Sequence, residues 1–379
     1  MSAIKIDLLK KLCLAFGPSG NEDEVRDIII EEIKDYADDY FVDKVGNLVV
    51  FKKGDKTPEK KRMFSAHMDE VGFMVTSVDG DGYIKIKTVG GIDSAVILGK
   101  QATVGDKRFP AVFGGKPIHL LKGDEYNKAR GIDAMYLDIG VTKAEKEKDK
   151  DGEDKDAEKK GKKKKGKEDK ENKDDDKDKK KDEPKPVDVG EFAVFKSEFY
   201  QFGENDSLIK CKAIDDRFGC YILIEMIKSS LAFDSYFAFT ICEEIGLRGA
   251  QTVGNVVKPD IAVIIEATTA GDIYDKKQKN KVCSLGNGAV IPMRDNSTIH
   301  DKKLVELAFN TAAKHSIKVQ QKNIISGGTD AGAIQLSGKG VSVLGISLPT
   351  RYIHSPSCVG NISDMCECLK LALEMEKII

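Results

Sequence analysis

An apolar run that ends in two adjacent glutamates places the strongest constraint on how this chain can fold. The run covers residues 236–242, and Glu243 and Glu244 follow it directly. Its β-prone composition and the nearby glycines predict a buried strand that stops in a turn, with the next helix opening near Gly249. Two carboxylates at the end of a core strand repel each other, and burying them is costly unless a cation or a proton accompanies them. An exposed acidic turn is the alternative interpretation of this stretch taken alone.

Neighbouring side chains diverge, so one of these glutamates could bind a metal while the other faces a substrate. A predicted strand over residues 62–66 delivers a second group of polar residues, His67 and Asp69. Residues two apart point to the same side of an extended segment. The pair could therefore act as a metal ligand and its supporting carboxylate, although a structural histidine is the alternative.

Acids or a histidine also lie at the start of one predicted helix and after two predicted strands. Asp215 and Asp216 open an apolar helix, and the role of helix N-cap explains one of them but not both. The apolar run at 260–265 ends at Glu266, and the strand predicted over 341–348 is followed by His354. Like Glu243 and Glu244, each of these residues falls near the carboxyl end of a predicted strand or in the loop that follows it.

Strands alternate with helices on both sides of a β-rich segment, which predicts one α/β domain interrupted by an insertion. The expected parts are a first catalytic part at 1–70, an inserted β-rich domain at 71–205 and a second catalytic part at 206–379. In open α/β sheets, ligands collect beyond the carboxyl ends of the strands. Two imidazoles and several carboxylates without thiolates suit a pair of Zn²⁺, Co²⁺ or Mn²⁺ ions. The residues expected at this edge are His67, Asp215, Glu243, Glu244, Glu266 and His354.

Composition restricts the environment and the partners of the chain. The 379 residues carry a formal charge of -2, which predicts no general affinity for nucleic acid. No stretch approaches ~20 continuous apolar residues, so no membrane span is expected. The amino terminus has no signal-peptide pattern. The 8 scattered cysteines predict reduced, buried thiols in a cytoplasmic protein.

Residues 143–186 differ from the rest of the chain. They hold 19 Lys against 17 Asp or Glu and almost no apolar residue. Such a stretch cannot bury enough surface to offset the entropy of ordering it, which predicts disorder. Because its charges nearly cancel, we expect a solvated loop rather than an arm that binds nucleic acid.

Local patterns give two smaller expectations. Asn21 is a good N-cap for a helix that carries acids in its first turn. His300 and His315 flank an ordinary amphipathic helix and are expected at the surface.

Six motifs, spread in order along the chain, resemble the tetrahedral aminopeptidases, a family of di-metal metallopeptidases that includes glutamyl and deblocking aminopeptidases. The resemblance covers nearly the whole chain except 143–186. It rests on the segments Gly17-Pro-Ser-Gly-Asn21, His67-Met-Asp-Glu-Val-Gly72, Ala213-Ile-Asp-Asp-Arg217, Glu243-Glu-Ile-Gly246, Gly327-Gly-Thr-Asp-Ala-Gly332 and Arg351-Tyr-Ile-His-Ser-Pro356.

The resemblance implies a role for each matching residue. Asp215 would bridge two metals, and its peptide bond to Asp216 would be cis. Asp69 would orient a histidine ligand, and Glu243 would be the general base. The remaining ligands would be His67 and Glu266 for one metal and Glu244 and His354 for the other, with Glu266 standing where many relatives have aspartate.

The same resemblance implies an activity and an assembly. A hydroxide bridging the metals would attack the first peptide bond of a peptide substrate. The β-rich domain would mediate dimerisation, and dimers would build a twelve-subunit tetrahedral shell. The charged insert stands where the family has a short helix. Other readings remain open at this stage: a different di-metal amidohydrolase or deacylase, a cellulase, or a non-catalytic scaffold on the same fold.

Overall fold

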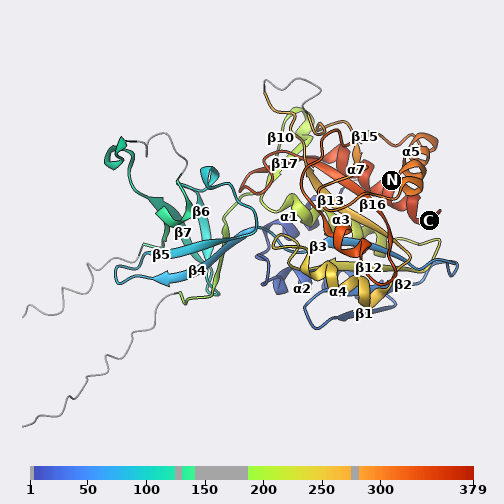
Figure 1. Ribbon diagram of the computed structural model, residues 1–379, viewed down its shortest axis with the longest axis horizontal. Coiled ribbons are helices and arrows are strands. Elements are labelled where there is room, and N and C mark those ends of the chain that lie inside the picture. Colours follow the sequence, from blue (N-terminus) through green and yellow to red (C-terminus); the bar gives the residue numbers. More distant parts are fainter. Residues whose placement is uncertain (1–3, 124–129, 141–186, 275–280) are drawn as a thin grey trace, which may run out of the picture.

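The computed structural model describes residues 4–123, 130–140, 187–274 and 281–379. An α/β body and a smaller β-barrel lie beside each other and are joined by a narrow neck of chain (Figure 1). The sequence predicts disorder for the charged insert at 143–186. This insert lies outside the described residues. None of the helices in the described ranges has both the length and the apolar character that crossing a membrane requires.

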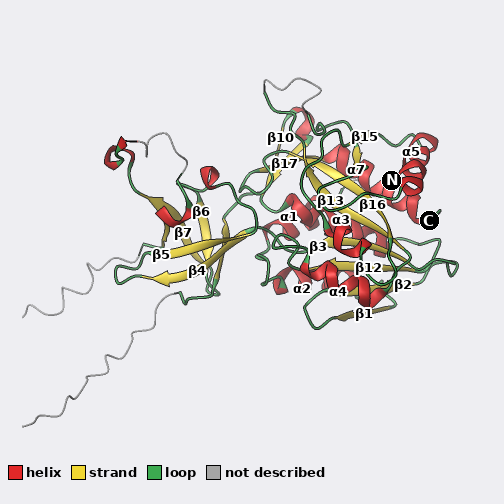
Figure 2. Cartoon of the chain, in the orientation of Figure 1, coloured by secondary structure: helices red, strands yellow, loops and turns green. Residues whose placement is uncertain are grey.

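A mixed sheet forms the centre of the body (Figure 2). Four adjacent strands are parallel, and antiparallel pairings flank them on both sides. This arrangement confirms the α/β mixed-sheet prediction. In spatial order the strands are β1 (Asp39–Val42), β2 (Leu48–Lys52), β12 (Ser235–Thr240), β3 (Arg62–His67), β13 (Ile261–Thr269), β16 (Ser342–Thr350), β14 (Ala289–Ile291) and β15 (Val319–Gln321).

Alternation along the strands gives this sheet two buried faces. In β12, Phe237 and Phe239 enter one apolar cluster, whereas Ala238 enters another on the opposite side. Because successive side chains point to opposite faces, each strand contributes apolar residues to both clusters, as Met63 and Phe64 of β3 also do. The first face is covered by α1 (Ile6–Leu14), α2 (Asp23–Ile33), α3 (Ile214–Lys228), α5 (Lys302–Lys314) and α7 (Ile362–Glu376), and the second by α4 (Arg248–Val257) and α6 (Asp330–Gln335).

The second unit is a closed antiparallel barrel with its own core. The rings of Phe73, Phe113 and Phe195 meet inside it, with centroids 4.7 to 5.6 Å apart. The β-rich character predicted for this segment is confirmed, while the domain boundaries stay a prediction. Around the barrel the strands are β4 (Gly72–Val78), β5 (Ile84–Val89), β8 (Met135–Asp138), β7 (Phe109–Gly115), β6 (Gln101–Val104) and β9 (Phe192–Phe195).

Two local expectations are wrong. Asn21 does not cap α2, which begins at Asp23 and has no side-chain cap; the neighbouring Glu22 instead accepts from the backbone N–H groups of Gly20 and Cys242. His300 is buried rather than exposed. A Cβ added at Gly345 would lie 3.1 Å from the His300 ring, so this glycine on β16 makes room for the imidazole. His315 is exposed, as expected.

A buried ion pair joins the C-terminal helix α7 to strand β3. Arg62 on β3 donates to the main-chain oxygen of Glu376 on α7 at 2.5 Å, and its guanidinium lies 3.9 Å from the Glu376 carboxylate. That carboxylate also accepts from the N–H groups of Ala232 and Phe233 at 3.0 and 2.9 Å. One carboxylate therefore holds α7, β3 and the loop before β12 together.

We expect Glu376→Gln to lower the free energy of unfolding by about 3–5 kcal/mol, because it leaves the Arg62 charge buried without its partner. Denaturant unfolding followed by circular dichroism measures the loss. Glu31→Gln is the matched control, since Glu31 pairs with Lys34 at 2.9 Å on an exposed helix face and its loss should leave the midpoint unchanged. Equal midpoints for the two variants would contradict the prediction.

Candidate active site

The parallel strands of the body end at one edge of the sheet, and the predicted site residues gather there. Thr240, the last residue of β12, lies opposite His67, the last residue of β3. The turn after β12 adds two glutamates, and β13, the start of α3 and the segment after β16 add the rest. All six predicted ligands and bases are brought to this edge: His67, Asp215, Glu243, Glu244, Glu266 and His354.

Two imidazoles each face a pair of carboxylates, and one carboxylate is common to both pairs. His67 Nε2 lies 3.2 Å from Asp215 Oδ1 and 3.2 Å from Glu266 Oε1. His354 Nε2 lies 3.3 Å from Asp215 Oδ2 and 3.2 Å from Glu244 Oε1. Asp215 therefore lies between two neighbouring groups of ligand atoms, and each of its oxygens faces a different histidine.

The far nitrogen of each imidazole is held by a different partner. His67 Nδ1 lies 3.1 Å from the main-chain oxygen of Asp69 and 3.3 Å from its Oδ1. His354 Nδ1 lies 2.7 Å from the carbonyl oxygen of Gly91, in the loop that follows β5 of the barrel. A donor N–H on Nδ1 leaves the Nε2 lone pair directed at the carboxylates, which is the orientation that a metal ligand needs.

Asp69 also holds the turn that carries the two glutamates. Its Oδ1 accepts from the N–H of Glu243 at 3.0 Å, and its Oδ2 accepts from the N–H of Glu244 at 3.1 Å. Ser19 Oγ donates to the same carboxylate at 2.6 Å. Asp69 is fully buried, so one side chain positions both His67 and the turn after β12.

The two neighbouring glutamates have different surroundings. The Glu243 side chain makes no hydrogen bond or ion pair within the described residues, whereas Glu244 faces His354. Burial raises the pKa of Glu243 well above its usual range, opposed by the nearby His67 and reinforced by Glu266. Because both side chains are largely buried, the interpretation of this stretch as an exposed acidic turn is wrong.

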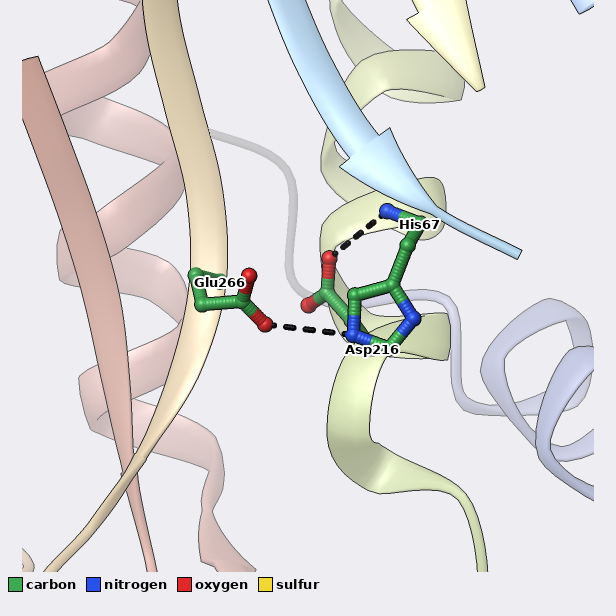
Figure 3. A group of neighbouring side chains, drawn as sticks. All are labelled: His67, Asp216 and Glu266. Atoms are coloured by element: carbon green, nitrogen blue, oxygen red, sulfur yellow. Dashed lines mark hydrogen bonds and ion pairs between the residues drawn. The ribbon is translucent and has the colours of Figure 1, made fainter. Parts of the chain in front are cut away.

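Asp216 has a different role from its neighbour. The peptide bond between Asp215 and Asp216 is cis, which confirms the expectation from the family resemblance. Asp216 accepts from the N–H of Gly219 at 3.0 Å and from that of His67 at 3.3 Å (Figure 3). In the same view Glu266 reaches the His67 ring from β13. Asp215 and Asp216 have non-helical backbone angles, so the Asp216 side chain caps the regular part of α3 and joins it to the end of β3.

The buried acids suit divalent cations. Ligand atoms of His67, Asp215 and Glu244 lie within 4.8 Å of one another, as do those of His67, Asp216 and Glu266. Burial raises the pKa of Glu266 to about 8, and its Oε2 has no hydrogen-bond partner. Burial also acts to raise the pKa of Asp215, but the two imidazoles outweigh it and lower that pKa. Buried carboxylates that lack protein cations, together with imidazole nitrogens, form a donor set that Zn²⁺, Co²⁺ and Mn²⁺ accept.

A cleft of about 350 Å³ opens beside this group. Glu243, Glu244 and Glu266 line one part of it, and the glycine-rich segment 326–329 lines another. Lys322 also reaches the cleft, and the sequence alone gave no signal for it. Asp330, which follows the glycines, binds Thr240 Oγ1 at 2.5 Å and leaves its buried Oδ1 without a partner.

Comparisons with known proteins agree with this architecture. The sequence profile of the family described as M42 glutamyl aminopeptidase matches residues 46–151 and 155–371. The chain is similar to a TET aminopeptidase from a marine sediment Thaumarchaeota archaeon, with 32% identity, a TM-score of 0.84 and coverage of 99% of this chain and 96% of that chain.

Two further similar proteins come from Pyrococcus species. The TET1 peptidase of Pyrococcus horikoshii, described as able to assemble into a tetrahedron or a large octahedral shell, is 30% identical, with a TM-score of 0.77 and 99% of each chain covered. A lysyl aminopeptidase of Pyrococcus furiosus is 28% identical over 97% of this chain and 95% of its own length.

We expect Asp69→Asn to weaken metal binding by about 10–100-fold, because the amide places an NH₂ group where a backbone N–H now donates and loosens His67. A metal titration of the stripped protein measures the change. Asp43→Asn is the control: Asp43 Oδ1 likewise accepts from backbone N–H groups, those of Val45 and Gly46 at 3.0 and 2.9 Å, but in the turn between β1 and β2. Equal metal affinity in Asp69→Asn and the wild type would contradict the positioning role of Asp69.

Proposed function

The chain belongs to the M42 glutamyl aminopeptidase family and is a peptidase, and on this basis we propose that it removes the first residue of peptides with the help of two divalent metal ions. The observation that carries the proposal is the position of Asp215 between His67 and His354. Each histidine also faces one further carboxylate, so the chain offers two adjoining ligand sets.

In this proposal His67, Glu266 and Asp215 hold one ion, and His354, Glu244 and Asp215 hold the other. Asp215 is preferred to Asp216 because its oxygens face the imidazoles, whereas Asp216 accepts from backbone N–H groups. When bound, the ions would supply Lewis acidity to activate a water molecule and to polarise the scissile carbonyl.

Glu243 is the general base of the proposed reaction. Its carboxylate lines the cleft and makes no hydrogen bond within the described residues, so it is free to accept a proton from the water. A pKa raised by burial brings a carboxylate closer to the range in which proton transfer is efficient near neutral pH. Glu243 then passes this proton to the leaving amine, which departs neutral.

The choice of bond follows from the family resemblance. The free α-amine of the first substrate residue would be held near the ions and the acids that line the cleft. A peptide bond inside a chain has no free amine beside it. The proposal therefore restricts cleavage to the first residue.

The proposal extends to the assembly. We assign residues 71–205 to a dimerisation domain, with residues 1–70 and 206–379 forming the catalytic domain. The similarity to a peptidase that forms tetrahedral or octahedral shells supports a homo-oligomer built from such dimers, up to twelve subunits. The eight free cysteines support a reducing compartment such as the cytoplasm.

We expect the purified protein to bind about two divalent ions per subunit and to hydrolyse aminoacyl anilides that have a free amine. A chelator should abolish hydrolysis, and added Co²⁺ or Zn²⁺ should restore it. Metal analysis beside anilide kinetics tests this. Hydrolysis of N-acetylated anilides alone would favour a deacylase, and full activity after metal removal would overturn the di-metal proposal.

Glu243→Gln and Glu244→Gln should fail in different ways. Glu243→Gln removes the proton acceptor, so kcat should fall by about 10²–10⁴-fold while the metal content stays near that of the wild type. Glu244→Gln weakens a metal ligand, so metal should be lost and excess metal should restore part of the activity. The reverse pattern of metal loss would exchange the two roles.

A further inference from the structure

The glycine-rich segment 326–329, called the wall segment below, lines the cleft although little of it is buried. Gly327 and Gly328 are exposed, and Ser326 and Thr329 are only half-buried. The backbone N–H groups of Gly327 and Gly328 donate to no acceptor within the described residues. Because so little apolar surface holds this segment, its conformation depends on the few hydrogen bonds that it makes.

The loop formed by residues 295–298, before α5, supports the wall segment from outside the cleft. The N–H of Asn296 donates to the carbonyl oxygen of Gly327 at 2.8 Å. A Cβ added at Gly328 would lie 3.2 Å from Ser297 Oγ, so this glycine allows the loop and the wall segment to approach closely. None of these four loop residues lines the cleft itself.

Asp295 holds this loop together and also reaches the wall segment. Its Oδ1 accepts from the N–H groups of Ser297 and Thr298, both at 2.7 Å, and from Ser297 Oγ at 2.9 Å. Its Oδ2 accepts from Thr329 Oγ1 at 3.3 Å. Ser297 Oγ in turn accepts from the N–H of Thr329 at 3.3 Å. Asp295 therefore fixes Thr329 both directly and through Ser297.

Hydrogen bonds, and not an ion pair, hold the buried Asp295 carboxylate. No lysine or arginine nitrogen in the described ranges lies within 4.0 Å of it, and the His300 Nε2 lies 3.9 Å from its Oδ2. Burial lowers the pKa of His300, although the charge of Asp295 opposes this shift, so the imidazole is neutral near pH 7. Removing the carboxylate therefore takes away the acceptor that the loop and Thr329 share, without leaving a buried cation unpaired.

We propose that Asp295 is a positioning residue for substrate binding, which fixes the wall segment in the conformation that contacts the bound peptide. The role of Asp295 rests on the proposed aminopeptidase function. Asp295 contacts none of the proposed metal ligands and does not contact Glu243 in the described ranges. Its loss should therefore weaken substrate binding and leave the chemical step intact.

Steady-state kinetics of Asp295→Ala test this role, with whichever of the glutamyl, leucyl and lysyl anilides the wild type hydrolyses best. We expect KM to rise about tenfold, as the loss of one or two hydrogen bonds would give. The kcat of the metal-loaded variant should stay within about threefold of the wild type, and its metal content should not change. Hydrogen exchange should become faster in residues 293–300 and 323–335 and stay unchanged in the rest of the body.

Asp301→Ala is the matched control. Asp301 Oδ1 also accepts from the N–H groups two and three residues further on, those of Lys303 and Leu304, at 2.9 and 3.2 Å. Its Oδ2 also accepts from a hydroxyl group, that of Ser342, at 2.9 Å. Asp301 caps α5 and makes no contact with the wall segment in the described ranges, so its loss should leave KM at the wild-type value.

Ser297→Ala is a milder second variant that does not depend on the folding of Asp295→Ala. It removes the acceptor of the Thr329 N–H without touching the cleft, so KM should rise about threefold at unchanged kcat. Because Ser297 is one of the groups through which Asp295 acts, the double variant should have nearly the KM of Asp295→Ala alone.

The outcomes separate the role of Asp295 from the proposed function. A folded Asp295→Ala with the wild-type KM overturns that role and leaves the aminopeptidase standing, as does an equal rise of KM in Asp301→Ala. Loss of metal or of kcat at unchanged KM would assign Asp295 to the reacting centre and would also overturn it. If Asp295→Ala does not fold, a wild-type KM in Ser297→Ala is the overturning result. No hydrolysis of any of the three anilides by the metal-loaded wild type overturns both proposals.

Discussion

The burial of many carboxylates at one edge of the sheet is the constraint on which the rest of the structure depends. Two kinds of buried acid occur there. Glu70 lies 2.5 Å from Lys212 Nζ and 3.4 Å from Arg217 Nη2, so protein cations neutralise it. Glu243 and Glu266 have no lysine or arginine within salt-bridge distance in the described ranges. Because an uncompensated buried charge is costly, Glu243 and Glu266 call for an external cation or a proton, whereas Glu70 does not.

Glu70 and its two cations position residues of the site without lying in the cleft themselves. Lys212 and Arg217 also donate to the carbonyl oxygens of Ala15 and Gly17, at 2.9 and 3.1 Å. The cluster around Glu70 therefore fixes the chain after α1 against the segment that follows β3. Ser19, which donates to Asp69, lies in this fixed chain. The N-terminal motif thus acts on the proposed ligand His67 through Asp69, without itself reaching the cleft.

The sequence predicted the position of those site residues that directly follow a buried strand. Glu266 and the glutamate pair could be placed because apolar runs reveal buried parallel strands, and the ends of such strands share one edge. Lys322 and His300 could not be placed in this way. The position of Lys322 depends on a loop that folds back through Ser326, and that of His300 on the missing side chain of Gly345, and neither contact has a local sequence signal.

The family resemblance assigned the bridging role to Asp215, but the local sequence pattern alone did not separate Asp215 from Asp216. The sequence showed that one aspartate had to do more than cap a helix, but both choices satisfied the pattern. Only the direction of the oxygens, toward imidazoles in one case and toward backbone N–H groups in the other, separates them.

The barrel takes part in the active site and does not only stand beside it. Gly91, in the loop after β5, accepts from His354 Nδ1 and so fixes the ring that faces Asp215 and Glu244. The preceding Gly90 has a φ of +86°, and a Cβ added there would lie 3.2 Å from the Glu244 Cβ. A side chain at Gly90 would be strained at this φ and would crowd Val71, 2.9 Å away, as well as Glu244. The position of the barrel therefore sets the acceptor that orients His354, one of the proposed ligands.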